Sequence, residues 1–216
     1  MSEQIDFFGM FLTLFSLAVL LSQTLAETIA YLMNHSVSLL ENPEKLPHTR
    51  SERRLRLFFL ILPLYGISAC LAANAAQLLI FWVFIAFMLL ISIMDFEQQI
   101  ILNQVLLPLL FLALCFSPVL PALLLNRLLA AAAGGAIFFL MAVLTKGGIG
   151  GGDIKLIFVL GLWLGTEKLL FTVLLGCLSA GLIGALLLLG KRKRPGDTIA
   201  YGPYFALSAI VSLLIK

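Results

Sequence analysis

Long apolar runs separated by short polar stretches dominate this chain. A membrane-spanning helix needs roughly 20 mostly apolar residues, with a range of about 17–25. Eight runs approach or reach that length: 7–33, 57–73, 77–94, 100–116, 128–145, 154–164, 169–189 and 199–215. The run 154–164 is the shortest, and it would need residues from the segment before it to cross a bilayer. The pattern predicts an all-α, polytopic membrane protein with about eight transmembrane helices.

The polar stretches divide the chain into two expected parts. Residues 34–56 form the longest polar stretch, which is rich in charge and carries Pro43 and Pro47. We therefore expect residues 1–56 to form one transmembrane helix and a short basic loop, and residues 57–216 to hold the other helices. The N-terminus begins acidic, whereas a cleavable signal peptide begins basic, so we expect the first apolar run to be retained.

Composition supports a membrane protein and argues against several binding functions. The chain is 62% hydrophobic and 12% charged, whereas soluble domains are about 45–50% apolar and about 25% charged. Its formal net charge of +3 is small, so we expect the lipid bilayer and no nucleic acid as a partner. Cys70, Cys115 and Cys177 lie in apolar runs without paired spacing, which predicts small buried hydrophobic side chains. We expect neither a metal site nor a cofactor.

The positive charges predict an orientation, because Lys and Arg favour the cytoplasmic side of a membrane. If the N-terminus faces outside, eleven of the 14 Lys and Arg fall on the inner side. These are Lys45, Arg50, Arg53, Arg54, Arg56, Lys146, Lys155 and the four at 191–194, while Arg127, Lys168 and Lys216 fall outside. This arrangement predicts that both termini lie outside and that Asp95 and Asp153 lie at the cytoplasmic boundary.

The stretch with the most distinctive chemistry is residues 146–156, where five glycines within six residues run into Asp153. Glycine lets another backbone approach closely, and an acid beside the bilayer is a functional candidate. No Gly-Lys-Ser/Thr follows, which argues against a phosphate-binding P-loop. The spacing also does not match the dinucleotide fingerprint. A flexible linker with Asp153 as an N-cap remains the simpler alternative.

A second acid, Asp95, ends the third apolar run at the same expected depth as Asp153. Two close carboxylates share a proton and titrate as a pair. One can activate a water while the other protonates a peptide carbonyl, so the pair is a candidate proteolytic dyad. An ordinary interfacial acid is the alternative for Asp95. We assign the glycines to substrate binding, namely Gly147, Gly148, Gly150, Gly151 and Gly152. Glu27, a charge inside the first run, is a further candidate for substrate binding.

Three separated motifs resemble the type IV prepilin peptidases, a family of membrane aspartyl proteases with a Gly-x-Gly-Asp element. Residues 150–153 match that element, and the wider stretch continues as Asp-Ile-Lys-Leu. Asp95 is followed by Ile101-Leu102-Asn103, where the family has Ile-Pro-Asn or Ile-Pro-Asp. Residues 201–207 are similar to the family's Phe-Gly-Pro-Phe/Tyr-Leu-Ala-Leu. The resemblance covers residues 55–216 well and the N-terminal third poorly.

The resemblance implies an endopeptidase with Asp95 and Asp153 as its catalytic residues. Its substrates would be prepilins or pseudopilins of a type IV pilus or a type II secretion system. The cut would follow a glycine, between a basic leader and a hydrophobic helix, at the cytoplasmic face of a bacterial inner membrane. Larger members carry two Cys-x-x-Cys pairs in a loop after the first span and also methylate the new N-terminus. Residues 34–56 contain no cysteine, so we expect no methyltransferase activity.

Two other functions fit the same pair of acids. One is an intramembrane protease like the signal peptide peptidases, acting on other substrates. The other is a small transporter that uses Asp95 and Asp153 as a proton or cation site. The Gly-Pro-Tyr element near the C-terminus and the spacing after Asp95 favour the prepilin peptidase.

Overall fold

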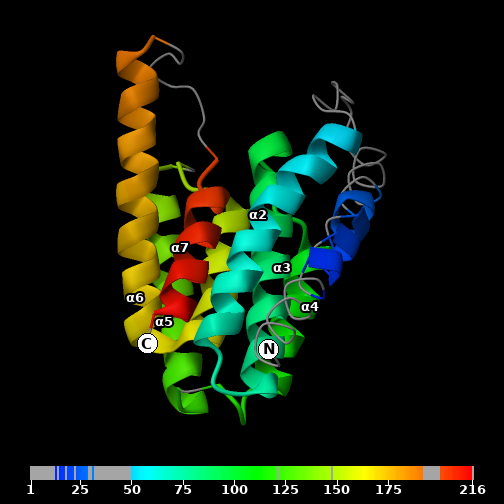
Figure 1. Ribbon diagram of the computed structural model, residues 1–216. Coiled ribbons are helices and arrows are strands. Elements are labelled where there is room, and N and C mark those ends of the chain that lie inside the picture. Colours follow the sequence, from blue (N-terminus) through cyan, green and yellow to red (C-terminus); the bar gives the residue numbers. More distant parts are fainter. Residues whose placement is uncertain are drawn as a thin grey trace. The chain divides into compact units, whose positions relative to one another are not determined.

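The computed structural model of the protein is helical throughout the part of the chain that it describes. That part comprises residues 13, 15–17, 19–21, 23–28, 31, 50–120, 122–146, 148–191 and 200–215. The helices are α2 (Arg50–Leu71), α3 (Ala75–Gln98), α4 (Asn103–Cys115), α5 (Leu124–Leu144), α6 (Gly151–Leu189) and α7 (Gly202–Leu214) (Figure 1). These residues contain no strand. The prediction of an all-α fold is confirmed.

The chain forms two compact units, Met1–Ala86 and Phe87–Lys216, with the boundary inside α3. In the first unit, α2 is joined to the beginning of α3 through Tyr65 and Trp82. Their rings stack with centroids 5.3 Å apart, and the Tyr65 hydroxyl donates a hydrogen bond of 2.8 Å to the Trp82 carbonyl. The division at residue 56 that the sequence suggests stays a prediction.

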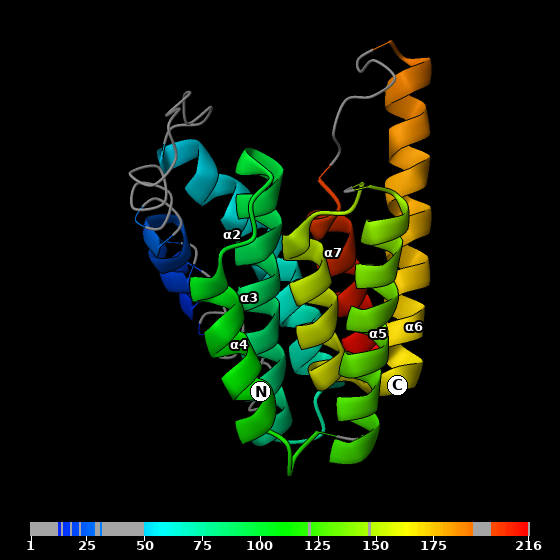
Figure 2. The same ribbon diagram turned by 180° about the vertical axis from the view of Figure 1, so that it is seen from behind.

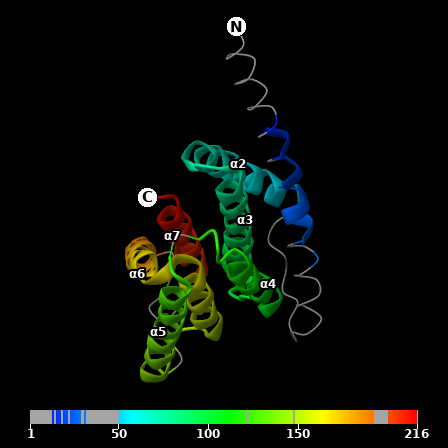
Figure 3. The same ribbon diagram turned by 90° about the horizontal axis from the view of Figure 1, so that it is seen from below.

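The second unit is built around α6, against which α4, α5 and α7 pack (Figure 3). Gly165 interrupts α6 with φ 75° and ψ 179°, a conformation that is essentially restricted to glycine. The residues on either side, 151–164 and 166–189, therefore form two arms that run in opposite directions (Figures 1 and 2). The reversal returns the chain to the end of the unit at which α6 begins.

Close helix packing in the second unit depends on small residues, as is common between helices in membranes. A Cβ on Gly161 would lie 2.5 Å from the backbone of Ala131, so α5 and the first arm of α6 are nearly in backbone contact. Gly176 in the second arm accommodates the ring of Phe205 from α7 in the same way. Buried apolar residues fill the space between these helices, including Leu109, Ala130, Phe138, Leu156, Leu160, Trp163, Ala209 and Leu213.

A buried cation joins three helices at the end of α5 where the chain enters it. Arg127 is fully buried and donates hydrogen bonds to the carbonyls of Leu162 and Ala113 and to the Ser117 hydroxyl. No carboxylate among the described residues forms an ion pair with it, so backbone carbonyls supply most of its acceptors. Arg127, which the charge pattern places on the outer side of the membrane, therefore links α4, α5 and α6 through its hydrogen bonds.

The outer surfaces of the helices are suited to a bilayer. Three of the described helices are long and apolar enough to cross a membrane, namely Ala75–Gln98, Leu124–Leu144 and Gly151–Leu189, whereas the apolar parts of α2, α4 and α7 are shorter. Exposed leucines recur at every fourth position of the second arm of α6: Leu170, Leu174, Leu178, Leu182 and Leu186. Large exposed apolar surfaces are rare on soluble monomers, so this stripe indicates contact with lipid.

The cysteines do not lie where the sequence pattern places them. Cys70, Cys115 and Cys177 are free thiols and all three are exposed, so the prediction that they are buried is wrong. An apolar run contains residues on every side of its helix, and the run alone does not tell the core-facing side from the lipid-facing side when both are apolar.

Candidate active site

Asp95 and Asp153 are brought to the same end of the second unit by the directions of their helices. Asp95 lies in the last turn of α3, and Asp153 lies in the first turn of α6. Both side chains are buried, with exposed fractions of 5% for Asp95 and 9% for Asp153. The position of Asp153 is locally favourable, because the partial positive charge at a helix N-terminus stabilises an acid in the first turn.

The two aspartates line one cavity of about 210 Å³. Its other lining residues are Gln99, Ile100, Ile101, Gly150, Gly151 and Gly152. Gln99 ends α3 in the left-handed region, with φ 55°, and its N–H donates to the Asp95 carbonyl at 2.8 Å. This turn leads the chain from Asp95 into the cavity wall formed by Ile100 and Ile101. The two carboxylates that the sequence pairs therefore line the same cavity.

The backbone of α7 holds Asp95 in place. The N–H of Gly202, the first residue of α7, donates a hydrogen bond of 2.8 Å to Oδ2 of Asp95. A Cβ on residue 202 would lie 2.6 Å from that oxygen, so only glycine allows this approach. Sequence reasoning recognised the Tyr-Gly-Pro motif but did not count Gly202 among the site residues. The sequence did carry a signal for this contact. A glycine at the start of a helix lets another group approach the backbone closely, and a proline after it fixes the direction in which the chain enters the helix.

One carboxylate oxygen of Asp153, the Oδ1 atom, is buried and accepts no hydrogen bond from any residue that the structure describes. The Oδ2 atom faces the backbone of Gly150, where an added Cβ would lie 3.3 Å away. A buried polar atom of this kind is costly unless something donates to it. Asp153 thus has an oxygen available to a ligand in the cavity.

The glycines of the loop have different surroundings. Gly152 packs against Ile101, where a Cβ would lie 3.0 Å from the Ile101 Cβ, so this glycine lets α6 approach the segment after Asp95. Gly151 lines the cavity and has open space on the side where a Cβ would project. Gly148 packs on Thr145 and does not line the cavity. Gly147 lies outside the described residues.

The remaining candidates are not part of this cavity. Glu27 is exposed and belongs to the first unit, so its role in substrate binding stays a prediction. The Nζ atom of Lys155 donates to Oδ1 of Asn103 at 3.0 Å, which joins α6 to the first residue of α4. Among the residues that the structure describes, no three His, Cys, Asp or Glu side chains gather into a group that could hold a metal ion.

Comparison with known proteins points to one family. The sequence model of the type IV leader peptidase family matches residues 82–185, a segment that includes both aspartates. The chain is 33% identical over 145 residues to a protein of Stutzerimonas stutzeri named prepilin leader peptidase/N-methyltransferase, covering 64% of this chain and 49% of that one. A protein of the same name from Pseudomonas aeruginosa is 34% identical over 145 residues, with the same two shares.

A third protein of that name, from Bacillus subtilis, is 31% identical over 158 residues, which are 68% of this chain and 63% of that one. The chain spans about half the length of the Stutzerimonas and Pseudomonas relatives. No solved structure matches the chain significantly. The family match covers the motifs around Asp95 and Asp153, and together with the relatives it supports the assignment of this chain to the type IV leader peptidase family.

Proposed function

We propose that this protein is a membrane aspartic endopeptidase that removes the leader peptides of type IV prepilins or pseudopilins. The observation that carries the proposal is that Asp95 and Asp153 are buried in one cavity, on two helix ends that the fold brings together. The match to the leader peptidase family supports the peptidase activity and the class of substrate.

The hydrogen bonds of the two aspartates suggest different roles. The N–H of Gly202 points at Asp95, and a donor of this kind favours the charged form of a carboxylate. Asp153 has a buried oxygen without a donor, which suits the protonated form. We therefore assign Asp95 as the base and Asp153 as the proton donor.

In the proposed reaction, the oxygen of a water attacks the scissile carbonyl carbon while Asp95 takes its proton. Asp153 gives its proton to the carbonyl oxygen, and a tetrahedral diol forms. The C–N bond then breaks as the leaving nitrogen takes the proton from Asp95, and Asp153 regains a proton from the diol hydroxyl. Each carboxyl group returns to its starting state, so no cofactor is required by this mechanism.

The glycine-rich start of α6 supports binding of an extended peptide. Because Gly151 lines the cavity and nothing lies within 4 Å of the place where its Cβ would be, the backbone of a substrate has room to approach the aspartates at this position. In the same proposal the chain crosses the bacterial inner membrane about eight times, with both termini outside and the aspartates at the cytoplasmic boundary. The eleven basic residues on the inner side support this orientation.

The two alternative functions have less support. A transporter would use the aspartates as an ion site, but the match to a peptidase family favours hydrolysis. An intramembrane protease like the signal peptide peptidases would use the same dyad on other substrates. The named relatives are prepilin leader peptidases, which favours prepilins.

Co-expression with a prepilin tests the function directly. Asp95→Asn and Asp153→Asn should each abolish the mobility shift that marks leader removal, because an amide can neither take nor give the required proton. Glu97→Gln is the matched control, since Glu97 is an acid one helical turn or less from Asp95 that does not line the cavity. It should process the prepilin at nearly the normal rate. Substantial processing by either aspartate variant, at equal membrane levels, rules out the dyad.

A further inference from the structure

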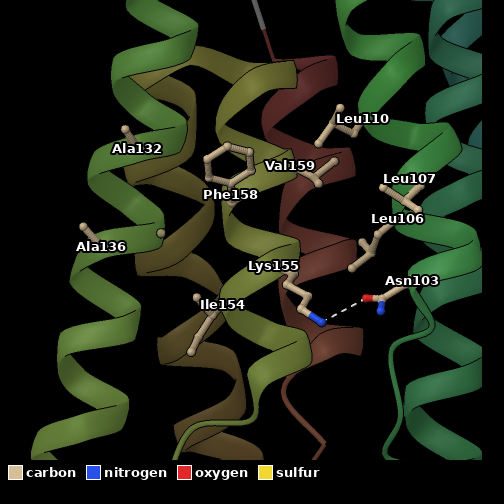
Figure 4. Close-up of a pocket in the computed structure, with 11 residues that line it drawn as sticks. Asn103, Leu106, Leu107, Leu110, Ala132, Ala136, Ile154, Lys155, Phe158 and Val159 are labelled. Atoms are coloured by element: carbon tan, nitrogen blue, oxygen red, sulfur yellow. Dashed lines mark hydrogen bonds between the residues drawn. The ribbon is translucent and has the colours of Figure 1, made fainter.

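A second, larger cavity lies beside the aspartates and has no role in the mechanism above. It is a groove of about 570 Å³, formed by α4, α5 and the first arm of α6 (Figure 4). Leu106, Leu107 and Leu110 form the α4 wall, Ala132 and Ala136 the α5 wall, and Phe158 part of the floor. Its volume lies within the range of about 300–1,000 Å³ that is typical of binding sites.

The groove is polar only at the end near the aspartates. There the Nζ atom of Lys155 donates to Oδ1 of Asn103 at 3.0 Å (Figure 4). Asn103 lies two residues after Ile101, and Lys155 lies two residues after Asp153, so both follow residues that line the active-site cavity. An ammonium group has three donor hydrogens and an amide has two. One donor hydrogen of Lys155 forms the bond to Asn103, and the remaining donor hydrogens of the two side chains have no acceptor among the described residues.

We propose that this groove binds the first turns of the hydrophobic helix that follows the scissile bond of the substrate. The inference rests on the proposed peptidase function and assigns the substrate to a particular face of this chain. The groove extends along α4 from Asn103 to Leu110, which at 1.5 Å per residue is about 10 Å, or two turns of helix. A helix lying in it would have its N-terminal end beside Asp95 and Asp153.

The polar end of the groove can donate hydrogen bonds to substrate carbonyls that would otherwise be unpaired. The backbone must be extended at the scissile bond to reach the aspartates, so the carbonyls between the cut and the helix lose their helical partners. An unpaired carbonyl is costly where water is absent. The spare donors of Lys155 and Asn103 lie where these carbonyls would pass. The donors at the polar end of the groove therefore match the carbonyl acceptors of the extended stretch, and the apolar walls match the helix beyond it.

The α5 wall favours a helix over a lipid chain as the occupant. Ala132 and Ala136 are four residues apart and so lie on one face of α5, and Gly135 lies beside them. Small residues at this spacing allow two helix backbones to approach closely. A flexible acyl chain needs no such surface. If the groove binds only a lipid chain, the experiments below should show normal processing and no cross-link to the substrate.

Filling the groove tests the proposal by kinetics. Ala132→Leu and Ala136→Leu should raise the KM for a prepilin and lower kcat/KM on the order of tenfold or more, as extra carbons in a binding pocket do. Ala133→Leu is the matched control, because Ala133 is exposed on the same helix and does not line the groove. It should leave both constants unchanged. Unchanged kinetics in the two groove variants contradicts the proposal.

Cross-linking tests it independently of any effect on folding. The enzyme would carry Asp153→Asn to retain uncut prepilin, with Cys70, Cys115 and Cys177 replaced by alanine and one cysteine introduced. Leu107→Cys should form a disulfide with a cysteine in the second turn of the substrate helix. Ile137→Cys should not, because Ile137 is equally exposed but outside the groove. The cysteine-free enzyme with Asp153 intact must first process prepilin.

The outcomes separate this inference from the proposed function. Cross-linking at Leu107→Cys alone, together with the kinetic loss, supports the groove as the substrate site. Normal processing with no cross-link, or with equal cross-linking at both positions, overturns the groove while the peptidase stands. Failure of the unmodified enzyme to process any prepilin overturns both.

Discussion

At the scale of single residues, the contact between Asp95 and Gly202 decides how the site is held. The two residues are 107 positions apart in the sequence, yet a backbone N–H and a carboxylate oxygen are in direct contact. The bond combines a charged acceptor with a donor at a helix N-terminus, and such bonds are among the stronger ones in proteins.

Gly202→Ala should therefore remove most of the activity. The new Cβ would lie 2.6 Å from Oδ2 and 2.8 Å from Cγ of Asp95, so the carboxylate must move and its hydrogen bond is lost. Loss of one aligned donor at an active site costs on the order of 10²–10³ in rate. The measurement is the rate of leader removal from a prepilin in detergent. Gly181→Ala provides the control, since a Cβ there meets nothing within 4 Å; equal rates for the two variants contradict this role of Gly202.

At the scale of elements, the reversal of α6 at Gly165 determines which helices meet. Because the two arms run in opposite directions, the first arm places Asp153 at the cavity and the second arm offers Gly176 to Phe205 of α7. Phe205 also packs edge-on against Phe138 of α5, with ring centroids 5.7 Å apart. The position of α7, and with it Gly202, therefore depends on the reversal.

Gly165→Ala should destabilise the protein by about 1–3 kcal/mol, because its backbone conformation is strained for any other residue. The added Cβ would also lie 3.0 Å from the Cβ of Ala122. Unfolding in detergent, followed by circular dichroism, should show a lower midpoint than the unsubstituted protein. Gly181→Ala lies in the second arm of the same helix without a positive φ and should unfold at the same midpoint or higher, as alanine favours helix. Equal midpoints for the two variants contradict the strain at Gly165.

Sequence patterns predicted the helices and the paired acids for clear physical reasons. Apolar runs of sufficient length form helices in a membrane, and an acid at the end of such a run is visible without any tertiary information. The contact of Gly202 with Asp95 could not be derived in this way, because it joins distant segments through backbone atoms. The burial of Arg127 was also missed. Its partners are carbonyls of Ala113 and Leu162, and every residue has a carbonyl, so no pattern in the sequence marks these two.

At the scale of the whole molecule, the proposed peptidase sites lie in a different part of the sequence from residues 34–56. Both sites of the proposed peptidase, the cavity and the groove, are formed by residues after Phe87. The relatives are named N-methyltransferases as well as leader peptidases. Residues 34–56, where larger members carry the cysteine-rich loop, contain no cysteine here and lie mostly outside the described residues.

We predict that this chain processes prepilin without methylating it. A ligand as large as S-adenosylmethionine needs a concave site that buries most of it, and a short polar loop with two prolines is poorly suited to form one. Mass spectrometry of pilin processed by this enzyme alone, in a host without another prepilin peptidase, should show a free α-amino group. A mature N-terminus heavier by one methyl group, about 14 Da, contradicts the prediction.

The hydrogen bond from Gly202 to Asp95 also has a consequence for biosynthesis. Asp95 and Asp153 are translated and can enter the membrane well before residue 202 leaves the ribosome. Until α7 has been inserted, Asp95 lacks the donor that holds its carboxylate in the cavity. We therefore expect a nascent chain, in which α7 has not yet been inserted, to lack the proposed proteolytic activity.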